Sequence, residues 1–326
     1  MSSASRIVLA LQMAACALLL AAAFRFVGGA PAALSREPEA PSTVTGDAYP
    51  RVVRDAHGDT LRLEQPPARL GSQALSTDEF LFSIVPAARI VIASPYAADP
   101  RYSFVAHLAG ETDPAKATDP ESIVLRSPEV LFVSHTARAE YVEQVRASGI
   151  PVFRMTTVFE QLEQIASALR VTGFIVGEDE AAEREIRRFL ERIRAAKELA
   201  APGDKPARIL AFSNLAHTFG AGSLFDRIVT DLGAVNVAAE QGVGPYGSIT
   251  SEQVAAWNPD WIVAGVEPGR ATTERDRLRA DPGIAVTHAG REGQILLIEN
   301  RAYLSMSHHA VVVMETLAAA LHGGKR

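Results

Sequence analysis

The side chains best suited to chemistry in this sequence are histidine, aromatic and arginine residues that follow predicted strands. In the second half of the chain these are His217, Phe219, Tyr246, Tyr303 and His308. Aromatic and cationic groups suit a large planar ligand or a metal chelate, because rings stack on rings and cations meet carboxylates or catecholates. Ligands of open α/β sheets bind beyond the carboxyl ends of the strands, so we predict a ligand-binding site in these loops.

The first half of the chain offers a similar set after its own predicted strands. Its members are Thr77, Asp78, Tyr96, Tyr102, His135 and Arg138. We therefore expect two groups of ligand-binding residues, one from each half of the chain.

The adjacent residues His308 and His309 have two interpretations. A histidine that follows a strand could coordinate an iron left open by its chelator, because neutral imidazole suits iron. This makes His308 the candidate metal ligand. Alternatively, one of the two caps the closing helix and the other is solvated. His135 and His217 have the same ambiguity.

Strands alternate with helices through most of the sequence, which favours mostly parallel sheets flanked by helices. The strands are expected at 68–74, 89–93, 130–133, 151–154, 207–212, 261–264 and 295–298. A hairpin is expected before them, around the turn-rich 56–59. The predicted class is α/β, with two lobes.

The longest helical pattern, Gly177 to Leu199, separates the two sets of strands. Its apolar residues recur at spacings of three and four and form one stripe, made of Ala182, Ile186, Phe189, Ile193 and Ala196. Acidic residues lead and basic residues dominate later, as the helix dipole prefers. Because chain of similar size and pattern lies on both sides, we predict a strut between two lobes.

The amino terminus has the pattern of an export signal. An apolar run from Ile7 to Phe24 follows Arg6 and contains Cys16, the single cysteine. Three fates stay open: cleavage near Ala30, lipidation at Cys16, or retention of the run as a membrane anchor. Each places the rest of the chain in the periplasm or otherwise outside the cytoplasm.

The predicted organisation has five parts. They are a signal peptide or anchor at 1–30, a disordered linker at 31–48, an N-terminal lobe at 49–176, the linking helix at 177–201 and a C-terminal lobe at 202–326. The net charge of −6 and the absence of a basic block argue against a nucleic-acid partner.

One local pattern occurs twice. In the segments that begin at Asp119 and Thr250, a capping residue opens a short helix, a glutamate lies in its first turn, and an x-Pro-acid corner leads into a buried strand. The glutamates are Glu121 and Glu252. A carboxylate in the first turn is stabilised by the helix dipole and still free to meet a guanidinium of a partner. The alternative is that both only stabilise their own helices.

From Val52 to Leu321 the sequence resembles the periplasmic-binding-protein family that serves uptake transporters for iron siderophores, haem and cobalamin. The likeness rests on Pro66-Pro67-Ala68-Arg69, the paired glutamate corners, the long helix, and the segment from Gly222 to Val237 with its Gly-x-x-Asn turn.

The resemblance implies a ligand cleft between two lobes, a rigid linking helix, and docking of Glu121 and Glu252 onto arginines of a membrane permease. It implies no intrinsic cofactor, since any metal arrives inside the bound chelate. A bare metal ion is disfavoured, because Ser72 to Ser76 lacks the histidine or carboxylate that related zinc and manganese binders place after the first strand. We expect a monomer that meets the membrane only through its permease or its amino-terminal segment.

Other functional classes have weaker support in the sequence. Gly242 to Gly247 fits G-x-G-x-x-G, but it contains Pro245 and follows a polar segment, so it predicts a loop. No hydrolase, phosphate-loop or zinc-protease motif is present, so we expect no enzyme. A membrane-anchored ligand sensor and a chelatase-like enzyme stay as alternatives.

Overall fold

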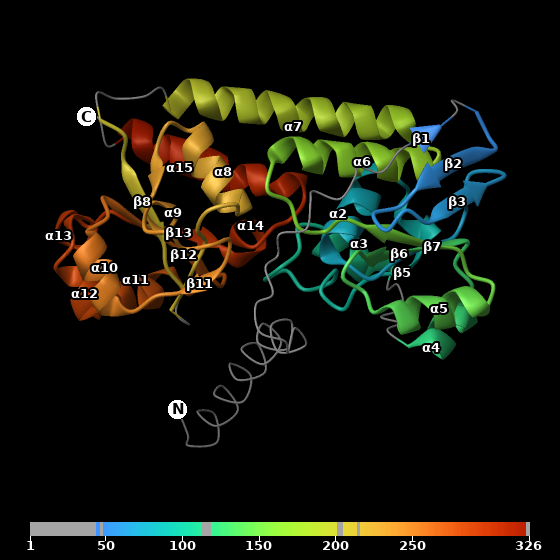
Figure 1. Cartoon of the computed structure of the whole chain (residues 1–326), viewed down its shortest axis with the longest axis horizontal. Coiled ribbons are helices and arrows are strands. Elements are labelled where there is room, and N and C mark those ends of the chain that lie inside the picture. Colours follow the sequence, from blue (N-terminus) through green and yellow to red (C-terminus); the bar gives the residue numbers. More distant parts are fainter. Residues whose placement is uncertain (1–43, 46–47, 113–118, 201–204, 214–215, 324–326) are drawn as a thin grey trace, which may run out of the picture. The chain divides into compact units, whose positions relative to one another are not determined.

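The computed structural model describes residues 44–45, 48–112, 119–200, 205–213 and 216–323 (Figure 1). The predicted export signal, with Cys16, and nearly all of the predicted linker lie outside these residues. Within the described part of the chain, no helix is both long and apolar enough to cross a membrane.

The first lobe contains two sheets. Its hairpin, as predicted, is made of β2 (Arg51–Arg54) and β3 (Thr60–Leu63), with β1 (Val44–Thr45) antiparallel to β2. The main sheet has the order β5-β4-β6-β7, and all its described strands are parallel. Their bounds are β4 (Leu70–Ser72), β5 (Ile90–Ile92), β6 (Val130–Ser134) and β7 (Val152–Met155).

Helices flank this sheet. They are α2 (Leu75–Ile84), the short 3-10 helix η1 (Ala87–Arg89), α3 (Ala106–Thr112), α4 (Pro120–Arg126), α5 (Ala139–Ala147) and α6 (Leu162–Val176). Residues 130–133 of β6 are all buried, as expected of a strand covered on both faces. Helix α3 was not predicted, since its seven residues carry too short a pattern to stand out in the sequence.

The second lobe repeats the arrangement with the sheet order β10-β8-β12-β13, again parallel throughout its described strands. The strands are β8 (Arg208–Ala211), β9 (His217–Thr218), β10 (Val235–Asn236), β11 (Gly247–Ser248), β12 (Trp261–Val266) and β13 (Ile295–Glu299). The helices are α8 (Leu224–Asp231), α9 (Val237–Glu240), α10 (Ser251–Trp257), α11 (Ala271–Ala280), α12 (Pro282–Ala285), α13 (His288–Glu292), α14 (Asn300–Tyr303), η2 (His308–Ala310) and α15 (Val311–Gly323).

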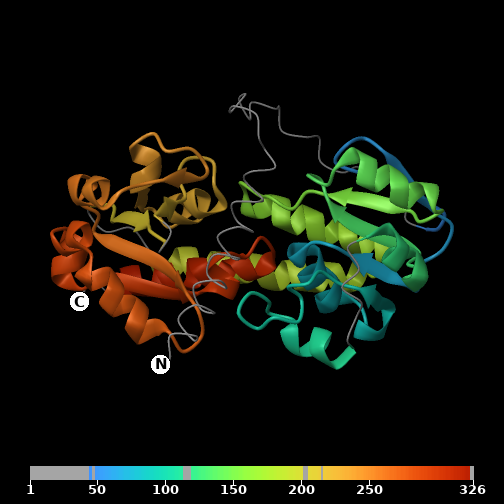
Figure 2. The same ribbon diagram turned by 90° about the horizontal axis from the view of Figure 1, so that it is seen from below.

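One long helix, α7 (Asp179–Ala200), joins the lobes. All five residues of the predicted stripe are buried, and they belong to a core that continues into both lobes. The helix packs along α6 of the first lobe and α15 of the second, as Figures 1 and 2 show. Salt bridges fix both ends, from Arg51 to Asp179 at 2.8 Å and from Lys197 to Asp231 at 2.8 Å. A helix held by both lobes limits how far one can rotate against the other.

Candidate functional site

The loop after β5 presents the two predicted tyrosines of the first lobe. Tyr96 and Tyr102 meet edge to face, with ring centroids 6.1 Å apart, and 40% of Tyr96 is exposed. The guanidinium of Arg101 lies over the Tyr102 ring at 5.4 Å and is paired with Asp99 at 2.7 Å. The loop therefore combines an accessible aromatic pair with a positive charge, which suits a flat ligand with acidic groups.

Thr77 and Asp78 lie behind this loop, and neither is accessible to a ligand in this structure. Both are fully buried in α2. The Asp78 carboxylate accepts the backbone N–H of Ser94 at 3.1 Å. Burial raises the pKa of Asp78 to about 6, because the charged form loses its hydration. The role visible for Asp78 is therefore to support the loop from behind.

The neighbouring Glu79 was not singled out in the sequence. Its side chain accepts the backbone N–H of Phe104 at 3.0 Å through one oxygen and the hydroxyl of Ser307, in the second lobe, at 2.5 Å through the other. Burial raises the pKa of Glu79 to about 7. The residue connects the two lobes, and no sequence signal marks it, because its partner is 228 positions away.

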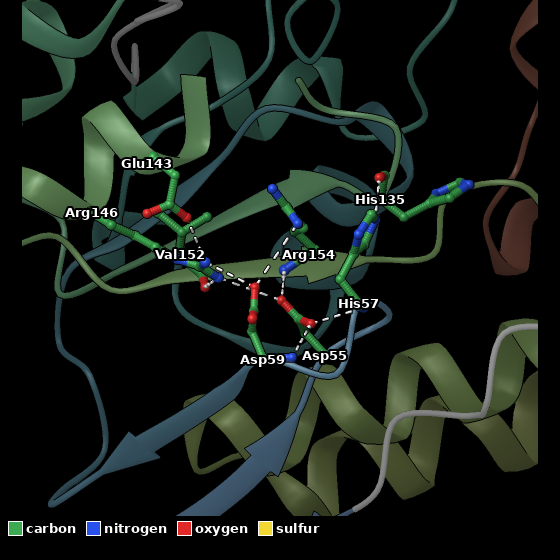
Figure 3. A network of polar contacts seen from close by, with 8 residues as sticks. All are labelled: Asp55, His57, Asp59, His135, Glu143, Arg146, Val152 and Arg154. Atoms are coloured by element: carbon green, nitrogen blue, oxygen red, sulfur yellow. Dashed lines mark hydrogen bonds and ion pairs between the residues drawn. The ribbon is translucent and has the colours of Figure 1, made fainter. Parts of the chain in front are cut away.

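His135 belongs to a polar network at the end of β6 that Figure 3 shows in detail. Its ring nitrogen Nδ1 accepts the backbone N–H of Thr157 at 3.3 Å, and its carbonyl oxygen lies 2.7 Å from Nε2 of His57 in the hairpin. The buried Asp55 accepts the N–H groups of His57 and Arg154 at 2.9 and 3.2 Å.

Charged side chains extend the same network along the hairpin. Arg146 pairs with Asp59 at 2.8 Å and with Glu143 at 3.2 Å. The pair of Arg146 with Asp59 attaches the hairpin to α5. Arg138, the other predicted residue here, precedes α5 and is exposed.

In the second lobe, three predicted aromatic residues come together. The Phe219 ring lies 5.7 Å from Tyr246 and 5.5 Å from Tyr303, measured between centroids. These rings, with Phe225 and Met306 among others, line a pocket, and Tyr246 is 41% exposed at its side. We call Phe219, Tyr246 and Tyr303 the aromatic cluster. Parts of the chain that are distant in sequence build it, so the tertiary fold creates the site.

Tyr303 forms the inner part of the aromatic cluster. Its hydroxyl is buried and has no hydrogen-bond partner among the described residues. Burial raises the pKa of this phenol, so it stays neutral. Buried hydroxyls normally have a hydrogen-bond partner, so this one is an exception, and it lies beside the pocket.

The remaining histidines of the second lobe have different environments. His217 is exposed on β9, where its Nδ1 lies 3.3 Å from the hydroxyl of Ser248. His308 is only 2% exposed, with its ring stacked on Phe80 at 5.9 Å and close to His309 at 4.1 Å. In this structure a large chelate therefore has no direct access to the imidazole of His308.

The expectation that one histidine caps the closing helix and the other is solvated is wrong. Ser307 occupies the capping position, where its hydroxyl accepts the N–H of His309 at 3.2 Å. Desolvation lowers the pKa of His309 to about 4 and lowers that of His308 well below its usual value, so both are neutral. No three histidine, cysteine, aspartate or glutamate side chains gather as a metal site within the described ranges.

A second set of contacts joins the lobes next to the tyrosine loop. Arg101 reaches Glu267, which follows β12, at 3.9 Å. Phe104 stacks on His309 at 4.2 Å and lies under the guanidinium of Arg301 at 5.1 Å. These residues were not predicted, because nothing in their spacing distinguishes them from ordinary loop residues.

The paired corners have the same construction in both lobes. Asp119 accepts the N–H of Ser122 at 2.9 Å and caps α4, while Thr250 and Gln253 cap α10 reciprocally. Glu121 and Glu252 lie in the first turns of these helices, and both are exposed.

The helices also end alike, because a proline follows each one. Ser127 and Asn258 take left-handed conformations, with φ of 45° and 47°. Arg69 precedes β4, and Arg208 begins β8. They donate to the carbonyl groups at the ends of α4 and α10, respectively. The acid of each x-Pro-acid corner, Glu129 or Asp260, accepts a backbone N–H at the same place.

The protein has two α/β lobes with parallel sheets, joined by a single helix. Each lobe has aromatic residues near strand ends and one exposed glutamate corner. These features define a two-lobed ligand-binding protein. The family model described as "Periplasmic binding protein" matches residues 76–302. The chain belongs to this family, as its resemblance predicted. Membership implies an extracytoplasmic location, a small-molecule ligand and a membrane permease as partner.

Solved structures support the fold. The periplasmic heme-binding protein RhuT from Roseiflexus sp. RS-1 has a TM-score of 0.66 at 20% identity, covering 79% of this chain and 99% of that one. HutB, the periplasmic heme-binding protein of Vibrio cholerae, has a TM-score of 0.65 at 19% identity, covering 78% and 98%. A periplasmic heme-binding protein from Pseudomonas aeruginosa has a TM-score of 0.63 at 19% identity, covering 79% and 93%. No curated protein matches the sequence.

Proposed function

We propose that this protein is the substrate-binding component of an uptake transporter, that it captures haem between its lobes, and that it delivers the haem to a membrane permease. Its role is binding and delivery, without catalysis. It has no cofactor of its own, since the iron arrives within the ligand.

The observation that carries this proposal is the aromatic cluster of Phe219, Tyr246 and Tyr303. A porphyrin is flat and largely apolar, and aromatic side chains stack on such a surface. The edge-to-face pair of Tyr96 and Tyr102 supplies aromatic surface from the other lobe. The names of the structural neighbours, which describe haem-binding proteins, favour haem over ferric siderophores or cobalamin.

Charges and oxygen donors complete the fit to haem. Arg101 and Arg301 lie on the two sides of the lobe contact, where they pair with Asp99 and Glu299 at 2.7 Å. We propose that they exchange these partners for carboxylate groups of the ligand. A tyrosine phenol is one of the side chains that bind haem iron. Tyr96 and Tyr246 are the exposed candidates for this role, in preference to the buried His308.

Delivery requires contact with the membrane component. Glu121 and Glu252 are exposed, and each is fixed by a capped and anchored helix, which suits pairing with arginines of a permease. We propose that the protein acts as a monomer, that the parts of the chain follow the boundaries predicted above, and that the amino-terminal run is a signal or an anchor.

The proposal is tested by titrating the full chain with hemin, a ferric siderophore and cobalamin, following ligand absorbance and thermal unfolding. Hemin is expected to give a saturable spectral change and to raise the unfolding temperature, because a ligand that binds only the native state stabilises it. Tyr246→Ala is expected to weaken hemin binding about tenfold, the loss of one good aromatic contact.

Tyr141→Phe is the matched control, because this tyrosine is bonded to Gln73 at 2.7 Å and lies outside the aromatic cluster. Its hemin affinity is expected to equal that of the wild type. Binding of cobalamin or a siderophore without hemin would replace haem as the ligand. No response to any of the three, from a folded protein, would overturn the proposal.

A further inference from the structure

Two adjacent carboxylates on α2 hold the two ends of one loop. The carboxylate of Asp78 accepts the backbone N–H of Ser94 through both oxygens, at 3.1 and 3.3 Å. The carboxylate of Glu79 accepts the backbone N–H of Phe104 at 3.0 Å. The segment between them, residues 94–104, carries the tyrosine pair described above. Its two ends are therefore attached to neighbouring positions of one rigid helix.

The second oxygen of Glu79 reaches the other lobe. It accepts the hydroxyl of Ser307 at 2.5 Å. Ser307 follows α14, which ends at Tyr303 of the aromatic cluster, and its hydroxyl also accepts the N–H of His309. A single carboxylate thus fixes the tyrosine loop of one lobe and the segment after the aromatic cluster of the other.

Neither carboxylate has a compensating cation. Glu79 is 1% exposed, and no arginine, lysine or histidine forms an ion pair with either acid in the described part of the chain. The charged and titratable groups around the junction come from three elements, and among the described residues none of them forms an ion pair with either carboxylate. They are Glu185 and Arg192 on α7, Arg301 on α14, and His308 and His309 on η2. Buried unpaired carboxyl groups cost stability, which is hard to reconcile with a purely stabilising role.

We propose that Asp78 and Glu79 are positioning residues for ligand capture, clamping the 94–104 loop and, through Ser307, the segment that follows the aromatic cluster. The clamp keeps the two aromatic surfaces at the separation that a planar ligand requires. This inference deepens the proposed function and rests on it for the identity of the ligand. Neither acid contacts the ligand itself.

The test compares Glu79→Ala with Glu79→Gln in the full chain. Two quantities are measured: hydrogen exchange of the backbone amides at 94–104 without ligand, and the affinity for hemin. Alanine removes both bonds, so exchange at Phe104 is expected to accelerate at least about tenfold and affinity to fall about tenfold. Glutamine keeps an oxygen for Phe104 and an N–H for Ser307, so it is expected to restore most of both.

Glu180→Gln, at an exposed site on α7, is the control and should match the wild type. Ser307→Ala removes only the hydrogen bond between Glu79 and the second lobe. This variant tests the clamp if Glu79→Ala does not fold. It should weaken hemin binding while leaving exchange at Phe104 slow. Wild-type exchange and affinity in Glu79→Ala, or glutamine behaving like alanine, would overturn the clamp. If the wild-type protein does not bind hemin, the proposed function is overturned. The hydrogen-exchange rates of the variants still decide whether the clamp exists.

Discussion

The effect of Glu79→Gln on the free energy of unfolding is expected to change sign as the pH rises. Burial raises the pKa of Glu79 from 4.5 to about 7 in the native state. The native protein therefore holds a proton that the unfolded chain has released, and this favours folding at low pH. The contribution is fully present below the unfolded pKa near 4.5 and is lost as the pH rises through about 7. Glutamine does not ionise, so the variant does not lose stability in this way as the pH rises.

The size of the effect follows from the shift. The rise in the pKa of Glu79 from 4.5 to about 7 corresponds to a loss of about 3 kcal/mol in the free energy of unfolding between pH 4.5 and pH 7, at about 1.4 kcal/mol per pH unit. The lowered pKa values of His308 and His309 act in the opposite direction, since they stabilise the native state above pH 6.5 and are lost on acidification. Both histidines are present in both proteins, so their contribution cancels in the difference.

The assay is urea unfolding at pH 5, 6, 7 and 8, followed by the fluorescence of Trp257 and Trp261, the two tryptophans of the chain. At pH 5 the variant is expected to be equal to the wild type or less stable. At pH 8 it is expected to be more stable, by up to about 3 kcal/mol. Glu180→Gln should stay within about 0.5 kcal/mol of the wild type throughout. A Glu79→Gln difference that does not change with pH would refute the reasoning.

Two further predictions concern the linking helix and the glutamate corners. Phe189→Ala in α7 should lower the free energy of unfolding, measured by urea unfolding, by about 3–5 kcal/mol, because it opens a cavity in the core shared by both lobes. Leu190→Ala is the control, since this side chain is 43% exposed and its loss should cost below about 1 kcal/mol. The double variant Glu121→Ala with Glu252→Ala should bind hemin like the wild type and abolish permease-dependent uptake in reconstituted vesicles. The reason is that both carboxylates lie on exposed corners and are not part of the aromatic cluster. Normal uptake by the double variant would show that the two glutamates only stabilise their own helices.

The matched corners have a consequence for how the two lobes present themselves. In each, the glutamate helix is capped at its start by a side chain and held at its end by an arginine at the start of β4 or β8, an inner strand of the main sheet. The positions of Glu121 and Glu252 are therefore coupled to the sheets of their lobes. A movement of one lobe against the other would move one glutamate relative to the other.

The sequence by itself determined the elements whose signals are local. The stripe of α7 appears as a period of three to four residues because that face packs on both lobes. The helices α4 and α10 begin after the capping residues that the sequence identified, Asp119 and Thr250, and a proline follows each helix end. The buried strands and the α/β class followed from apolar runs alternating with helices. The family resemblance rested on the long helix, the paired glutamate corners and the segments 66–69 and 222–237.

Only the tertiary structure decided which of the candidate residues share a site. Phe219 and Tyr246 lie in loops and Tyr303 ends α14, and these three segments meet only in the folded chain. His308, in contrast, is buried against Phe80 of the other lobe. Glu79 reads in the sequence as an ordinary helical acid, and its meaning depends on Ser307, 228 residues away. Periodicity and capping report the immediate neighbours of a residue along the chain. Burial and long-range contacts arise only when distant elements pack together, and these set the accessibility and charge of the site.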